Sequence, residues 1–107
     1  MKILYFNLKK IWFDKMLSGE KSHEYREVKK HWEERLECFI THPQKISEYK
    51  KQGFPILANF RNGYQKDAPE FICEVVEITR KNGKDTDLNI DKEVYDIELD
   101  LSTLTRI

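Results

Sequence analysis

The densest group of polar side chains in the sequence lies between Ser18 and Arg26. Gly19 allows a tight turn between a predicted helix and a predicted strand, and Lys21 stands at the start of that strand. Glu24 and Arg26 are two positions apart, so in a strand they project from the same face. An arginine held by a carboxylate keeps spare N–H donors for a phosphate or a base edge. This spacing favours an anion- or nucleotide-binding site, and an ordinary solvent-exposed ion pair is the alternative.

A second candidate group is the segment Phe60-Arg61-Asn62-Gly63-Tyr64, in which Phe60 closes a predicted strand and Gly63 allows a tight loop. A guanidinium plane and a phenol ring can stack on an unstacked base, and the guanidinium can also hold phosphate. We therefore predict that Arg61 and Tyr64 help to bind a nucleic acid. A purely structural turn with a packed tyrosine is the alternative.

The segment from Leu17 to Arg26, just after a first strand and a short Trp-containing helix, resembles the ASCH domain family. The G-x-K-x-x-E-x-R pattern of that family is met by Gly19, Lys21, Glu24 and Arg26. The resemblance covers nearly the whole chain and implies a PUA-like fold, a β-barrel with helices packed against it. It also implies RNA binding in the cleft around the motif, with Lys21, Glu24 and Arg26 lining that cleft.

Some proteins similar to this family are amidohydrolases that remove the acetyl group from acetylated cytidine. In them a lysine at the Lys21 position acts with a threonine three residues later and with a carboxylate on a later strand, which Glu74 or Glu77 could supply here. This chain has Glu24 in place of the threonine, and a nearby carboxylate favours an ammonium over a nucleophilic amine. A ribonuclease would need an acid and a base such as His23 and Glu24, which strand alternation sends to opposite faces. We therefore expect binding without covalent chemistry, and a small amidohydrolase that acts on an acylated nucleoside such as acetylated cytidine is the alternative.

Length, charge and cysteine content limit the remaining choices. A chain of 107 residues predicts one domain over 1–107. Lysine plus arginine and aspartate plus glutamate both total 19, but residues 1–66 carry a net charge of +6 and residues 67–107 a net charge of −6. The fold could present a basic face, or the two halves could neutralise each other. We expect a cytoplasmic protein that binds RNA or a nucleotide and has no membrane span and no cofactor. We also expect no metal site, because the sequence has no Cys-x-x-Cys pair.

The predicted elements give an α+β fold, a PUA-like small β-barrel of about five or six strands flanked by two or three short helices. Apolar residues on both faces of the first strand predict that it is buried, and Asn7 is the expected cap of the first helix. Asn82-Gly83 predicts a tight hairpin turn. Trp12 and Trp32 are expected to anchor the core. Strands are predicted over Ile3–Leu8, Ser22–Val28, Pro55–Phe60, Phe71–Arg80 and Glu93–Leu101, and helices over Lys9–Leu17 and Lys29–Glu37, with a short third helix between Pro43 and Gly53.

The last two predicted strands carry six of the eleven acidic residues of the second half. Strict alternation puts Phe71, Cys73 and Val75 on one face and Ile72, Glu74, Val76 and Ile78 on the other. If the second face is interior, Glu74 is a buried carboxylate that needs Arg26 or Lys21 as a partner. In the final strand we expect Tyr95, Ile97, Leu99 and Leu101 to point inward and Val94, Asp96, Glu98 and Asp100 outward. Such an acidic face would suit a protein-interaction module, which is a further alternative for the function of the chain.

Overall fold

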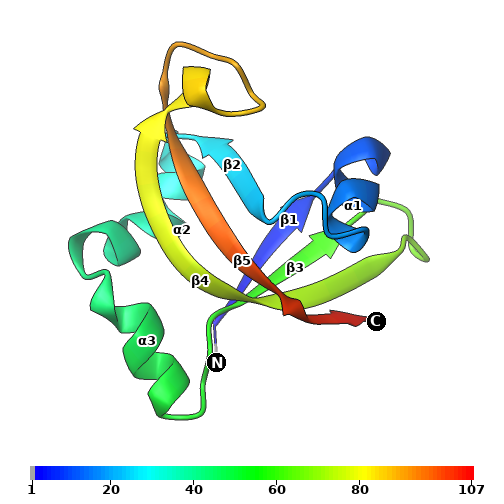
Figure 1. The fold of residues 1–107 in the computed structure, drawn as a ribbon, viewed down its shortest axis with the longest axis horizontal. Helices are drawn as coiled ribbons and strands as arrows, with labels where there is room; N and C mark the ends of the chain where they lie inside the picture. Colours follow the sequence, from blue (N-terminus) through cyan, green and yellow to red (C-terminus); the bar gives the residue numbers. More distant parts are fainter. Residues whose placement is uncertain (1) are drawn as a thin grey trace.

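The structure is a computed structural model that describes residues 2–107. The chain order is β1 (Ile3–Asn7), α1 (Lys10–Leu17), β2 (His23–Glu27), α2 (Lys30–Thr41), α3 (Gln44–Lys51), β3 (Leu57–Arg61), β4 (Glu70–Asn82), the short 3-10 helix η1 (Gly83–Asp85) and β5 (Glu93–Arg106). The five strands form one sheet in the order β1-β3-β4-β5-β2, in which β1 and β3 are parallel and the other neighbours antiparallel. The sheet curls into a half-barrel, and α2 and α3 pack against β4 (Figure 1). The predicted α+β class, a small PUA-like barrel flanked by helices, is confirmed.

Aromatic rings fill the interior of the half-barrel. Phe6 of β1, Phe60 of β3 and Phe71 of β4 are buried and form a stacked series, with successive ring centroids 5.1 and 5.2 Å apart. Phe13 of α1 packs on Phe71 at 5.0 Å between centroids. Because aromatic side chains bury the largest apolar areas, this series holds β1, β3, β4 and α1 together.

Strand β1 lies at an edge of the sheet, so the prediction of a strand buried on both faces is wrong. Its side chains alternate, and Tyr5 is 67% exposed between two buried neighbours. The prediction that Asn7 caps the first helix is also wrong. The residue at the N-cap of α1 is Lys9, without a side-chain cap, whereas the Asn7 amide donates a hydrogen bond to the carbonyl of Gly63 at 2.7 Å.

A bulge in β4 changes which of its side chains face the core. Cys73 and Val75 are buried, as their alternation predicts. The pairing with β5 shifts just after Val75, and the extra residue returns Ile78 to the core face. The prediction that Ile78 shares a face with Glu74 is therefore wrong. Glu74 lies outside the core, where its carboxylate pairs with Lys50 of α3 at 3.2 Å.

Strand β5 is more deeply buried than its alternation predicts. The inward positions Tyr95, Ile97 and Leu99 are confirmed, and Leu101 is half-buried. Val94 and Asp96, expected outside, are buried as well. Val94 packs closely against Gly83, and Asp96, which is 5% exposed, pairs with His23 at 2.7 Å and with Lys81 at 2.8 Å. The predicted acidic outer face therefore loses one of its three carboxylates to ion pairs.

The connection between β4 and β5 is a loop over residues 83–92, where the sequence predicted a two-residue turn. Asn82 accepts a hydrogen bond from the backbone N–H of Lys84 at 2.8 Å and starts η1 instead of closing a hairpin. A Cβ on Gly83 would lie 2.7 Å from Ile90, so glycine is needed here for close packing. This loop lies beside β2, where Asp87 pairs with Lys21 just before the strand and Lys92 pairs with Glu27.

Helix α1 ends as predicted, whereas α2 is longer than predicted. Gly19 follows α1 with a φ of 84°, the left-handed conformation that commonly ends a helix. Helix α2 continues to Thr41, beyond the predicted end at Glu37.

Trp12 and Trp32, expected in the core, are only half-buried. Among the described residues, no helix is long and apolar enough to span a membrane.

Candidate functional site

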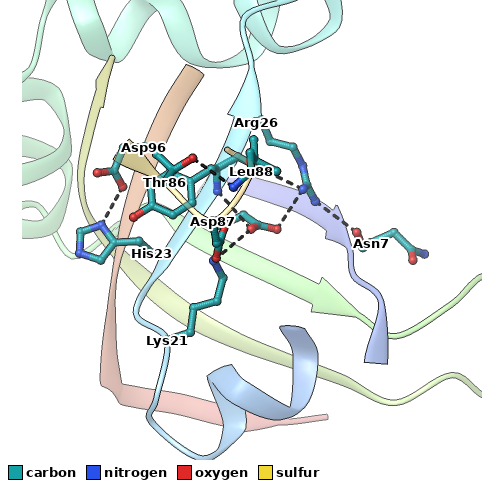
Figure 2. A network of polar contacts seen from close by, with 10 residues as sticks. Asn7, Lys21, His23, Arg26, Thr86, Asp87, Leu88 and Asp96 are labelled. Carbon is teal, nitrogen blue, oxygen red and sulfur yellow. Dashed lines mark hydrogen bonds and ion pairs between the residues drawn. The ribbon is translucent and has the colours of Figure 1, made fainter. Parts of the chain in front are cut away.

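Lys21, Glu24 and Arg26 line one cavity of about 270 Å³. Strand β2 carries Glu24 and Arg26 on one face, and Lys21 lies just before the strand. The cavity lies where β2 approaches β1, the other edge strand of the sheet. Figure 2 shows the polar network that joins its residues. The rest of the lining comes from the end of β1, the link to α1 and α1 itself, with Asn7, Leu8, Lys9 and Trp12, and from the 83–92 loop with Asp87 and Leu88.

Glu24 is the buried acid of this cavity, with 5% of its surface exposed. Its Oε1 accepts a hydrogen bond from the backbone N–H of Tyr25 at 3.1 Å. Its Oε2 lies 3.0 Å from Nη1 of Arg26 in an ion pair that lacks hydrogen-bond geometry, so among the described residues Oε2 has no hydrogen-bond donor. Burial raises the pKa of Glu24, although Arg26 and Lys21 oppose the rise. The carboxylate is thus desolvated, and its Oε2 is held by the charge of Arg26 without a hydrogen bond.

Arg26 is held in a fixed direction, as its spacing from Glu24 predicts. Its Nη2 donates to the backbone carbonyl of Asn7 on β1 at 3.1 Å, as Figure 2 shows. The guanidinium carbon lies 5.3 Å from the ring centroid of Phe6 and 5.5 Å from that of Trp32. Hydrogen bonding and cation–π contacts therefore orient Arg26 between the two edge strands.

The side chain of Lys21 is held by more contacts than its position before the strand predicts. Its Nζ lies 2.5 Å from Oδ2 of Asp87 and 4.0 Å from Glu24 (Figure 2). The ammonium also lies 5.3 Å from the centroid of Trp12 and 4.8 Å from that of Tyr25. Only 9% of the residue is exposed. The amine that a nucleophile would need free is occupied by an ion pair with Asp87.

Asp87 is the functional candidate that sequence reasoning missed. It lies 66 positions from Lys21 in a loop with no motif, and only the excess of acid in the second half of the chain hinted at it. At this cavity Asp87, from the acidic second half of the chain, pairs with Lys21 from the basic first half. The lining of the cavity carries three cationic residues, Lys9, Lys21 and Arg26, against the carboxylates of Glu24 and Asp87.

Arg61 and Tyr64 do not line this cavity. They line a separate hollow of about 450 Å³ beside β1, and Tyr64 is 88% exposed at the tip of its loop. Arg61 donates a hydrogen bond to the backbone carbonyl of Gln65. Asn7 lines both hollows, so the two predicted groups of residues are neighbours and not parts of one cleft.

The residues expected for catalysis are dispersed. Glu74 pairs with Lys50, and neither Glu74 nor Glu77 lines the cavity around Lys21. His23 pairs through Nδ1 with Asp96 and lines a different depression from Glu24, in keeping with strand alternation. Within residues 2–107, no three histidine, cysteine, aspartate or glutamate side chains are grouped so that they could hold a metal ion.

Comparison with known proteins leaves the cavity as the basis for any functional argument. No family model, curated protein or solved structure matches the chain.

Proposed function

We propose that the protein binds RNA or a modified nucleotide, with one nucleobase in the cavity lined by Lys21, Glu24 and Arg26. The observation that carries this proposal is the buried carboxylate of Glu24, a lining residue of the cavity whose Oε2 is held only by an ion pair with Arg26 that lacks hydrogen-bond geometry. A buried carboxylate oxygen without a hydrogen bond costs free energy, and an N–H group of a ligand that reached it would lower that cost. Nucleobases offer such groups, and carboxylates accept from the exocyclic amino group of cytosine.

The size and the walls of the cavity fit a single base. Its volume of about 270 Å³ lies at the lower limit of ligand pockets, which start at roughly 300 Å³. Trp12 supplies an aromatic side chain to the lining, with the ammonium groups of Lys15 and Lys21 each 5.3 Å from its ring centroid, so a base would contact the part of the ring that these leave open. A site of this size would take one base or nucleoside and leave the phosphate outside.

In this proposal the cationic residues that line the cavity have different roles. Arg26 lies at the cavity with three of its N–H groups engaged at most, so spare donors would be available for a phosphate or a base acceptor. Lys9 is exposed at the same cavity and would attract phosphate. Lys21 would act differently from the sequence-based expectation, because Asp87 already holds its charge. We assign it the positioning of Glu24 and Asp87.

The resemblance of Gly19, Lys21, Glu24 and Arg26 to the ASCH pattern supports the same class of ligand, since members of that family are thought to bind RNA in this region. In this proposal the partner is a cytoplasmic RNA or nucleotide, and the chemistry is recognition without bond making.

The test compares nucleotide binding by the wild-type protein and by Glu24→Gln, which keeps the side-chain volume and removes the charge. Isothermal titration with the four ribonucleoside 5′-monophosphates should show binding, and Glu24→Gln should weaken the best ligand by about tenfold or more, because a hydrogen bond to a charged group is worth about 1.5–3 kcal/mol. Arg26→Ala should weaken RNA binding and flatten its salt dependence.

Glu98→Gln on β5 is the matched control, since it removes a half-buried carboxylate that does not line the cavity. Circular dichroism melts establish that each variant is folded before binding is compared. The proposal is wrong if folded Glu24→Gln and Arg26→Ala bind as the wild type does, or if the wild type binds neither the monophosphates nor RNA.

A further inference from the structure

Aromatic side chains from three parts of the chain surround the second hollow, which we call the aromatic hollow. Tyr5 of β1, His31 and Trp32 of α2, and Tyr64 of the loop after β3 all line it, together with Arg61. Trp32 stacks on Phe6 at 5.1 Å and meets His31 edge-on at 4.7 Å, so its position is fixed by packing. The Trp32 side of the aromatic hollow is therefore pre-formed, and the rings of Tyr5 and Tyr64 are exposed beside it.

The most exposed rings of the aromatic hollow are available for stacking. Tyr5 is 67% exposed and Tyr64 is 88% exposed, although both are large side chains that gain by burial. Asn59 of β3 adds a buried polar amide to the lining. Rings that can stack, an amide and a guanidinium are the groups with which proteins hold unpaired bases.

Asn7 connects the aromatic hollow to the cavity around Lys21. Its Nδ2 donates to the carbonyl of Gly63 at 2.7 Å, and its Oδ1 accepts from the Gly63 N–H at 3.3 Å, so it fixes the loop that carries Tyr64. Its backbone carbonyl accepts from Arg26, whose guanidinium also contacts the ring of Trp32. Asn7 and Arg26 thus form the boundary between two neighbouring hollows.

We infer that the aromatic hollow is a second base subsite, and that the ligand is a single-stranded RNA with one base in the Lys21 cavity and a following or preceding base on Tyr64 and Tyr5. The inference rests on the proposed function, since it deepens the choice of ligand from a nucleotide to a strand. Arg26 at the boundary lies where the phosphate between the two nucleotides would pass. A duplex cannot place two bases in separate hollows without unpairing them.

The experiment compares the affinities of each monophosphate and the matching hexanucleotide, r(A)6, r(C)6 or r(U)6, by titration at one fixed salt concentration. The wild type should bind its best hexanucleotide more tightly than the monophosphate. Tyr64→Ala should remove about tenfold of the hexanucleotide affinity, the expected loss of one base–aromatic stack, and leave the monophosphate affinity unchanged. Tyr64→Phe keeps the ring and should bind like the wild type.

Phe54→Ala is the matched control, because Phe54 is another exposed aromatic residue that lies beside α3 and lines neither hollow. The inference is overturned if Tyr64→Ala binds the hexanucleotide as the wild type does, or if Phe54→Ala weakens it equally. A monophosphate that binds with no gain for the hexanucleotide also overturns it and leaves the proposed function standing. Absence of both kinds of binding refutes the proposed function itself.

Discussion

The burial of the Glu24 carboxylate predicts how the free energy of unfolding depends on pH in the absence of any ligand. Burial raises the pKa of Glu24 in the folded protein, which means that ionising this group costs the folded state more than the unfolded chain. Its contribution to stability is therefore fully present below the ordinary pKa and is lost as the pH rises through the raised pKa. Glutamine has the same shape and does not titrate. The stability of Glu24→Gln relative to the wild type should accordingly increase with pH across that window.

The maximum slope of this difference follows from linkage, at about 1.4 kcal/mol per pH unit while one proton separates the two states. Urea unfolding of both proteins between about pH 4 and pH 8 measures it, and each 1 kcal/mol corresponds to a change of about 4–8 °C in the melting temperature of a domain near this size. A constant offset caused by the amide near Arg26 would not affect the slope. The assay thus isolates the titration of one side chain.

Glu27 offers a control of opposite sign on the same strand. Its side chain pairs with Lys92 and Lys29, which lower the pKa of Glu27, so Glu27→Gln should lose stability relative to the wild type as the pH rises. The reasoning about Glu24 is refuted if its difference is independent of pH or falls with pH. The first result would mean that Arg26 and Lys21 offset the burial of the carboxylate, and the second that they outweigh it.

Two further predictions concern the frame of the site. Asn7→Ala should lower the free energy of unfolding by about 1–3 kcal/mol, because it removes two hydrogen bonds to Gly63, and urea unfolding should show no comparable loss in Asn62→Ala on the same loop. Burial raises the pKa of the Cys73 thiol to about 12, so iodoacetamide at about pH 8 should modify half-buried Cys38 before Cys73, and mass spectrometry that finds equal rates in the folded protein would contradict the buried thiol.

The parts of the fold that could be predicted from the sequence are those governed by local spacing. Glu24 and Arg26 share a face because alternation in a strand is strict over two residues, and Gly19 ends a helix because it can adopt a positive φ. These local rules placed the three motif residues correctly with respect to one another. They also gave the number and type of most elements.

Features that depend on distant partners could not be predicted in this way. Ile78 faces the core because β4 has a bulge, and nothing in its own sequence fixes the position of that bulge. Asp96 is buried because Lys81 and His23, which lie on other strands, contact its two carboxylate oxygens. Asp87 reaches Lys21 only through the tertiary path of a loop, and Tyr64 is kept outside the Lys21 cavity by the attachment of its loop to Asn7. Each of these depends on contacts between segments far apart in the chain.

The sheet does not close between β1 and β2, its two outer strands, and the side chain of Arg26 spans part of that opening. In a closed barrel the number and stagger of the strands fix the diameter of the interior. Within residues 2–107 no backbone ladder joins β1 to β2, so the reach of the Arg26 side chain and the rings of Phe6 and Trp32 that it contacts set the width of the opening. Substitution at that single position would therefore retune which ligands fit while the barrel strands and their pairing stay as they are.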